Sequence, residues 1–479
     1  MANTESLNDH KQLHVAMFPW LAFGHIIPFL ELSKFIAEKG HKVSFLSTTR
    51  NIQRLPTIPS NLSPLINLVK LTLPRVQELP EDAEATIDVH TQDVHHLKKA
   101  FDGLQPEVTR FLEKESPDWI IYDFAPYWLP SVAAGLRISR AFYSNFNAWF
   151  IAFLGASADD LISGSGYDHR TRVENFMTPP KWVPFPTNVC YRKYEAVRMV
   201  GNTSANASGI SSVYRVGMIL KGSDCMFIRH SYEFEPQWLT LLEKLHHLPV
   251  VPVGLLPPEK PTNIEDGNDE TWDTVKMWLD GQQKGHVVYV AFGSEVTLSR
   301  SELAELALGL ELSGLPFFWA LRKPVASTES KLVELPDGFL DRTSDRGLVW
   351  TSWAPQLQIL SHESVGGFLT HCGWSSIVEA MMFGHPLIML PCLADQGLNA
   401  RVMVDKKVGI EIPRNGEDGS FNKESVARSV RAVVADDEGK IYKENAMELS
   451  RLFGDTKMGK KYINHFIDYL EKTRRTLTV

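Results

Sequence analysis

Short apolar runs alternate with segments of helical periodicity along this chain of 479 residues, and the alternation occurs twice. The first series begins with the apolar run Leu13–Phe18, a loop at Pro19–His25, a helical segment with Pro28 in its first turn, and the run Val43–Leu46. A strand, a helix and a second strand in this order form a βαβ unit, which implies a parallel sheet covered by helices on both faces. The pattern predicts an α/β fold with doubly wound, Rossmann-like sheets.

A stretch rich in proline, glycine and acidic residues, Pro249–Thr271, separates the two series. Its composition is typical of a linker. A chain of this length is also too long for one core, so two domains are expected. We predict an N-terminal domain over residues 1–250, a linker over 251–271 and a C-terminal domain over 272–479, whose last helix can pack back on the N-terminal domain. Such domains face each other across a cleft and bind ligands at the carboxyl ends of their strands.

The composition excludes several classes of function. A net charge of −8 gives no general attraction to nucleic acid or to anionic lipid. The early apolar run Val15–Leu21 is too short for a membrane span or a secretory signal. Four cysteines without a C-x-x-C pair indicate neither a disulfide scaffold nor a zinc cage. We therefore expect a cytoplasmic monomer that binds no nucleic acid and does not insert into a membrane.

The run Trp353–Gln396 gathers side chains suited to a nucleotide sugar around one strand, one turn and one helix start. The N–H groups and the dipole at a helix start stabilise a diphosphate, which Gly373 lets approach closely. Trp353 offers a flat face to a base. The polar candidates are Gln356 for the base edge, His371 for a phosphate, Ser376 as helix cap and phosphate donor, Glu379 for ribose, Asp395 and Gln396 for sugar hydroxyls, and Ser294 for a further phosphate contact. Each alone is more often a packing or surface residue, but together they predict a nucleotide-sugar site.

A histidine and an aspartate follow two strands of the N-terminal series. His25 comes after the first strand, and Asp123 comes after the strand Trp119–Tyr122. An imidazole placed there can take the proton of an alcohol while the carboxylate bonds its far ring nitrogen. Aromatic residues at or after the same strand ends predict an apolar acceptor pocket, although each is equally consistent with ordinary core: Trp20, Phe23, Phe124, Tyr127, Phe146 and Trp149.

The run Trp353–Gln396 closely resembles the signature of plant UDP-sugar-dependent glycosyltransferases of family 1, from its Trp-Ala-Pro-Gln opening to its Asp-Gln close. The Phe-Gly-His-x-x-Pro segment Phe23–Pro28 and the strand end Ala291–Ser294 match the same family. The segments FPWLAFGH, GHKVSFLSTTRNIQRL and LTLPRVQELPEDAEAT resemble the subgroup that adds sugars to sugars already on a small molecule, including stevia 1,2-glucosyltransferases of steviol glycosides. The resemblance covers nearly the whole chain and implies the two-domain GT-B fold.

The resemblance also implies roles for single residues. It makes His25 and Asp123 the catalytic dyad, and it places donor contacts at Ser294, Trp353, Ala354, Gln356, His371, Gly373, Trp374, Ser375, Ser376, Glu379, Asp395 and Gln396. Trp374 is implied to contact the sugar, and the terminal glutamine favours glucose. Ser375 departs from the asparagine that is usual there, so a contact near the phosphate is expected to change. No Asp-x-Asp motif accompanies the site, and we expect neither a metal nor a resident cofactor.

The expected activity is the transfer of glucose from UDP-glucose, with inversion, to a sugar on a diterpenoid glycoside such as a steviol glycoside, in a 1,2 linkage. The same chemistry on a flavonoid glycoside, a triterpenoid glycoside or a bare aglycone is the nearest alternative. A nucleotide-sugar-binding protein without catalysis is more distant. A nicotinamide-dependent oxidoreductase shares the doubly wound fold but is disfavoured, because no G-x-G-x-x-G follows the first strand.

Overall fold

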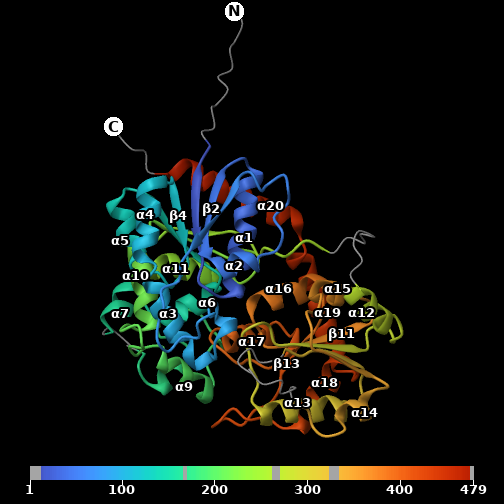
Figure 1. The fold of residues 1–479 in the computed structure, drawn as a ribbon. Coiled ribbons are helices and arrows are strands. Elements are labelled where there is room, and N and C mark those ends of the chain that lie inside the picture. The colour runs from blue at the N-terminus through green and yellow to red at the C-terminus, as the bar shows by residue number, and fades with distance from the viewer. Residues whose placement is uncertain (1–11, 165–169, 261–269, 323–333, 475–479) are drawn as a thin grey trace, which may run out of the picture.

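The computed structural model describes residues 12–164, 170–260, 270–322 and 334–474, and these form two α/β halves (Figure 1). Within them, one parallel sheet has seven strands in the order β3-β2-β1-β4-β5-β6-β7 and a second has six in the order β10-β9-β8-β11-β12-β13. The strands are β1 (His14–Phe18), β2 (Lys42–Thr48), β3 (Ile66–Leu71), β4 (Trp119–Tyr122), β5 (Ser139–Ser144), β6 (Cys225–Ile228), β7 (Val250–Pro252), β8 (Val287–Ala291), β9 (Phe317–Ala320), β10 (Gly347–Trp350), β11 (Val365–Thr370), β12 (Leu387–Met389) and β13 (Gly409–Glu411). All neighbouring strands pair in parallel, as the βαβ pattern predicts.

Helices cover both sheets. In the N-terminal half they are α1 (Phe23–Glu38), α2 (Thr49–Gln53), α3 (Val94–Asp102), α4 (Gln105–Glu115), α5 (Leu129–Gly135), α6 (Ala148–Leu154), α7 (Ala158–Ser163), α8 (Val173–Phe176), α9 (Lys193–Gly201), α10 (Ser212–Gly222) and α11 (Pro236–His246), with 3-10 turns η1 (Thr86–Asp88) and η2 (Thr91–Asp93). The others are α12 (Glu270–Asp280), α13 (Arg300–Ser313), α14 (Phe339–Thr343), α15 (Gln356–Ser361), α16 (Trp374–Phe383), α17 (Gln396–Asp405), α18 (Lys423–Val434), α19 (Gly439–Phe453) and α20 (Thr456–Thr473).

Local sequence signals fix several helix boundaries, as α13 illustrates. Ser299 caps its first turn by accepting the N–H of Glu302, and the Glu302 carboxylate accepts the N–H of Ser299 in return. This reciprocal pair is the capping box. Gly314 ends the helix with φ +71°, a left-handed conformation that glycine adopts without a steric penalty.

The last helix, α20, packs on the sheet of the N-terminal half, beside the N-terminal strands in Figure 1. Phe466 and Leu470 are buried among the residues of β1, β2 and α1. The indole N–H of Trp119 donates to the carbonyl of Leu470 at 3.0 Å, and His41 lies 3.1 Å from the carboxylate of Glu471. The helix α20, which follows the second sheet in the chain, therefore packs against the first sheet.

Two boundaries differ from the sequence-based expectation. The loop expected over Pro19–His25 is shorter, because α1 already begins at Phe23, with His25 in its first turn. Pro28 then lies inside α1, where it removes a bond to the carbonyl of Gly24. In addition, the linker is shorter than expected at both ends, because Val251 and Pro252 belong to β7, which completes the first sheet, and Glu270 and Thr271 belong to α12. Residues 261–269 of the expected linker lie outside the described residues.

The strand order places one switch point in each sheet. In the first sheet the order reverses between β1 and β4, and in the second between β8 and β11. Loops that leave neighbouring strands at such a point diverge to opposite faces, which opens a crevice at the carboxyl ends of the strands. His25 and Asp123 follow the first pair of strands, while Ser294 and His371 follow the second pair. Both sets of predicted site residues therefore lie where this fold binds ligands.

Candidate active site

His25 and Asp123 form a hydrogen-bonded pair. Nδ1 of His25 lies 2.7 Å from Oδ2 of Asp123, whose side chain is fully buried. Oδ2 of Asp123 also accepts the backbone N–H of Trp20 at 3.1 Å, and Oδ1 accepts that of Phe124 at 2.7 Å. Because a carboxylate can only accept, Nδ1 of His25 carries the proton and Nε2 keeps its lone pair. The pair has the arrangement that a general base requires.

The surroundings of His25 favour its protonated form. Burial alone would lower the pKa of His25, but the charge and hydrogen bond of Asp123 outweigh this effect. Glu295 and Asp395 from the C-terminal half add smaller contributions, and the pKa of His25 is raised above its ordinary 6.5. The imidazolium that forms when His25 accepts a proton is therefore stabilised.

Four of the six predicted acceptor-side aromatic residues lie at this pair. The ring of Phe146 meets that of His25 edge-on, with centroids 5.2 Å apart, and the ring of Phe124 lies 5.7 Å away. Trp20 packs behind Phe124 at 5.9 Å, and Phe23 begins the helical turn that carries His25. An apolar surface therefore borders the base.

The other two aromatic residues have different neighbours. Tyr127 contacts the ring of Tyr214 and the guanidinium of Arg215. Trp149 is fully buried, and its N–H donates to Asn399 of the C-terminal half at 2.9 Å. This burial favours a role for Trp149 in the contact between the halves over the expected contact with an acceptor.

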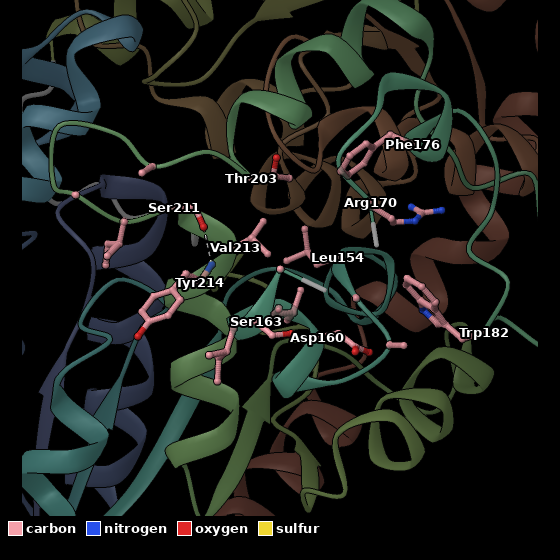
Figure 2. Close-up of a pocket in the computed structure, with 18 residues that line it drawn as sticks. Leu154, Asp160, Ser163, Arg170, Phe176, Trp182, Thr203, Ser211, Val213 and Tyr214 are labelled. Carbon is pink, nitrogen blue, oxygen red and sulfur yellow. Dashed lines mark hydrogen bonds between the residues drawn. The ribbon is translucent and has the colours of Figure 1, made fainter. Parts of the chain in front are cut away.

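A separate cavity of about 280 Å³ lies between α7, α10 and the end of α6. Figure 2 shows Tyr214 on one side of it and Trp182 on the other. Arg170 lines it too, with its guanidinium 4.3 Å from the centroid of Phe153. Neither His25 nor any of the predicted acceptor-side aromatic residues lines this cavity.

The loop after β11 presents His371 between two glycines. A Cβ on Gly373 would lie 2.5 Å from Nε2 of His371, and a Cβ on Gly293 would lie 2.8 Å from the same atom. Burial lowers the pKa of His371 to about 4, so the ring is neutral near pH 7. Among the described residues its buried Nδ1 has no hydrogen-bond partner, so this nitrogen is available to a polar group of a ligand.

The first turn of α16 carries no side-chain cap. Gly373 is the N-cap residue, and Ser376 stands at the third position inside the helix, so the expectation that Ser376 caps it is wrong. The first N–H groups of a helix have no partner within it, and without a cap they can bind an anion. Trp374 packs its ring against Trp149 at 5.2 Å and is 4% exposed. Its expected sugar contact would therefore come from its backbone.

The residues expected around base and ribose are divided between surface and interior. Trp353 is 76% exposed and offers an open ring face, and the following Ala354 is half-buried against the core. Gln356 is not free: its amide oxygen accepts the hydroxyl of Tyr289 at 3.1 Å, and its amide N–H donates to Glu379. An amide has a second N–H and a second lone pair, so the expected contact of Gln356 with the base edge stays a prediction. Burial raises the pKa of Glu379.

Asp395 and Gln396, at the start of α17, are held by hydrogen bonds from the preceding backbone and from one side chain of the helix. The side-chain oxygen of Gln396 accepts the N–H groups of Cys392 and Leu393 at 2.9 and 2.8 Å, which leaves its NH₂ group to donate. Oδ2 of Asp395 accepts from Asn399 at 2.8 Å. Burial raises the pKa of Asp395 to about 6, although the Asn399 bond and the charge of His25 act in the opposite direction.

Three further residues, which the sequence reasoning missed, connect the halves at this site. Asn399 bonds Trp149, Glu295 accepts the hydroxyl of Thr86 at 2.9 Å, and Arg229 bonds Ser375. Asn399 stands one helical turn after Asp395, a spacing that could have drawn attention to it. For the other two, the sequence around them carries no comparable signal.

Two kinds of feature are absent from the described residues. No set of three or more His, Cys, Asp or Glu side chains among them is grouped so as to hold a metal ion. In the same part of the chain, no helix is both long enough and apolar enough to cross a membrane.

Known proteins resemble this chain along its length. Residues 268–464 match the family model described as UDP-glucoronosyl and UDP-glucosyl transferase. UDP-glycosyltransferase 91D2 of Stevia rebaudiana is 66% identical, covering 100% of this chain and 99% of its own. Soyasaponin III rhamnosyltransferase of Glycine max is 42% identical, with 98% and 97% covered. The solved structure of Phytolacca americana UGT2 with UDP-2fluoro-glucose and pterostilbene is 26% identical, covering 96% of this chain and 100% of that one, with a TM-score of 0.70.

These similarities confirm the expected fold class, an α/β fold with two doubly wound halves, and the expected enzyme class. In this family the UDP-sugar is the co-substrate that donates the transferred group. The chain belongs to the family of UDP-sugar-dependent glycosyltransferases, in the plant group that includes the stevia enzyme.

Proposed function

We propose that the protein transfers glucose from UDP-glucose, with inversion, to a sugar already attached to a diterpenoid of the steviol type, forming a β-1,2 linkage. The observation that carries the glycosyl transfer is the His25–Asp123 bond, which sits at one switch point while the uncapped start of α16 follows the other. The acceptor class follows from the resemblance of the N-terminal segments to the subgroup that adds sugars to sugars, and the 66% identity with UDP-glycosyltransferase 91D2 of Stevia rebaudiana supports the glycosyl transfer.

In the proposed reaction His25 acts as the base. Nε2 of His25 takes the proton of an acceptor hydroxyl, and the hydroxyl oxygen forms a bond to the anomeric carbon of the glucose. The bond between that carbon and the phosphate oxygen breaks, and UDP leaves with the electron pair. Asp123 stabilises the imidazolium, and the N–H groups at the start of α16 stabilise the charge that grows on the diphosphate. Attack from the face opposite UDP inverts the anomeric centre.

The donor roles we propose follow from position and chemistry. Trp353 stacks on the uracil, Glu379 accepts the ribose hydroxyls, and His371 and Ser376 bond the diphosphate, with Ser294 as a further donor. Asp395 and Gln396 bind the hydroxyls of glucose, which the unengaged NH₂ group of Gln396 supports. On the acceptor side, Trp20, Phe23, Phe124 and Phe146 border the base with apolar surface, which suits a terpenoid skeleton.

The remaining expectations stay proposals. We propose that the protein acts as a cytoplasmic monomer without a metal or another cofactor. A purified sample tests the absence of a metal and the monomeric state. The activity should survive a strong chelator, and the mass in solution should be near the 54.0 kDa of one chain.

A panel of acceptors tests the proposed function. Purified protein is incubated with UDP-glucose and, separately, with steviol glycosides, flavonoid glycosides, triterpenoid glycosides and the bare aglycones. We expect mass spectrometry to show one added hexose on the steviol glycosides and linkage analysis to show a β-1,2 bond. Glucosylation of aglycones alone would contradict transfer to a sugar. A faster reaction with UDP-rhamnose would overturn glucose as the transferred sugar. Rhamnose is the alternative to test because the soybean rhamnosyltransferase is similar to this chain.

The pH dependence of kcat/KM should show the ionisation of two side chains of the free enzyme, His25 and Asp395. The pKa of His25 lies above 6.5 and that of Asp395 lies at about 6. Protonation of His25 removes the base, and protonation of Asp395 removes an acceptor for the sugar, so both changes lower activity as the pH falls. We expect log kcat/KM to drop with a slope approaching two below about pH 6. In Asp395→Asn the slope should approach one; equal slopes in both proteins would contradict a role for the Asp395 carboxylate.

A further inference from the structure

One buried guanidinium joins the end of β6 to the first turn of α16. Arg229 directly follows β6 and is 4% exposed. Its Nη1 donates to Oγ of Ser375 at 2.6 Å, across the boundary between the halves. Nε and Nη2 donate to the backbone carbonyls of Leu255 at 2.8 Å and Leu256 at 3.1 Å. Leu256 takes a left-handed backbone conformation, with φ +49°, in the segment that carries both carbonyls.

The charge of Arg229 is not neutralised at short range. Its three nitrogens donate to a hydroxyl and two carbonyls, and no carboxylate of the described ranges forms an ion pair with it. Burial lowers the pKa of Arg229, although Glu379 and Glu31 act against this from a distance. A buried cation is costly unless an anion balances it. Ser375 itself stands in the uncapped first turn of α16, whose dipole also favours an anion.

The bond to Arg229 also decides what the Ser375 hydroxyl can do. A hydroxyl has one proton to donate and two lone pairs to accept with. Since an arginine N–H occupies a lone pair of Ser375, the proton of the hydroxyl is free for an acceptor elsewhere. Donation from a cation makes that proton a stronger donor than an isolated serine would provide. An anion at the start of α16 is the acceptor that this arrangement suits.

We infer that Arg229 is a positioning residue for the diphosphate of the UDP-sugar, which it binds through the hydroxyl of Ser375. The inference rests on the proposed function and deepens it at the donor site. It also gives a reason for the departure at position 375, where the resemblance leads one to expect an asparagine. A serine supplies the donor to the phosphate here because an arginine from the other half orients it.

Calorimetric titration with UDP and with uridine separates this role from a structural one. Ser375→Ala keeps a good helix former in α16 and removes the hydroxyl. Arg229→Met removes the charge and keeps an apolar chain. A lost hydrogen bond to a charged group weakens binding by about 10- to 100-fold, so we expect each variant to weaken UDP by about that factor and uridine by less than about twofold. The double variant should bind UDP about as Arg229→Met does, because the two residues act as one unit.

A control variant shows whether a general loosening of the contact between the halves would by itself weaken the binding of UDP. Arg401→Met also removes a buried guanidinium that crosses the boundary, from α17 to Glu195 of α9, at 2.6 Å. In this control the ratio of the UDP and uridine dissociation constants should stay at the wild-type value. The inference is overturned if Ser375→Ala and Arg229→Met weaken both ligands equally, or if their separate losses multiply in the double variant. A wild-type protein that binds neither ligand would overturn the proposed function itself.

Discussion

Replacing His25 with alanine should lower kcat by about 10²- to 10⁴-fold, because general base catalysis contributes a factor of this size. The variant loses the imidazole that lies beside the fully buried Asp123 carboxylate and next to the rings of Phe124 and Phe146. The affinity for UDP should stay within about twofold, since the proposed donor contacts belong to the other half. Initial rates of UDP release and a calorimetric titration with UDP measure the two quantities.

Two companion variants make this result specific. Asp123→Asn presents an amide to Nδ1 of His25, which favours the wrong tautomer and removes the charge that raises the pKa of His25. Its kcat should fall by a similar factor, and its acid limb should move to lower pH. His465→Ala, on the exposed face of α20, should leave the rate unchanged. A His25→Ala enzyme that keeps more than about a tenth of the wild-type kcat would contradict the mechanism.

The sequence was sufficient to predict two doubly wound sheets with ligand sites at the carboxyl ends of their strands, but the strand order and its switch points came from the structure. Strands buried on both faces appear as short apolar runs, and β4 coincides with the run predicted from Trp119 to Tyr122. The side chains that follow such strands must then gather at one edge of the sheet. This reasoning placed His25 beside Asp123 although 98 residues separate them.

Contacts between the halves were beyond this kind of reasoning. Arg229 meets Ser375 across 146 residues, and Asn399 meets Trp149 across 250. The sequence near each residue does not predict its partner, because the contact depends on how the two halves pack against each other. Val251 and Pro252 were misassigned for a related reason: the prolines around them are typical of a linker, yet Pro252 occupies the last position of β7 at the edge of the sheet, where a missing N–H is tolerated.

Replacing Asn399 with leucine should lower the stability of the protein more than any other substitution proposed here. Its side-chain oxygen accepts N–H groups from Asn147 at 2.6 Å and Trp149 at 2.9 Å, and its NH₂ group donates to the carbonyl of Cys372 at 3.0 Å and to Asp395 at 2.8 Å. Leucine leaves all four partners buried without this bond. Unsatisfied buried groups cost about 1–3 kcal/mol each and do not add fully, so we expect a loss of about 3–5 kcal/mol. Scanning calorimetry should show an unfolding midpoint lower by about 3–5 °C.

The same substitution should alter catalysis in a way that lost stability alone would not. The bond from Asn399 lowers the pKa of Asp395, so its removal should raise that pKa above about 6 and move the acid limb of kcat/KM toward neutral pH. Asn188→Leu is the matched control, because this exposed amide also reaches α17, at Asp405, yet lies in solvent. It should change the unfolding midpoint by less than about 1 °C, since surface substitutions cost little. If Asn399→Leu behaved like this control, the hydrogen bonds of Asn399 would not be what joins Asp395, the proposed sugar ligand, to the N-terminal half.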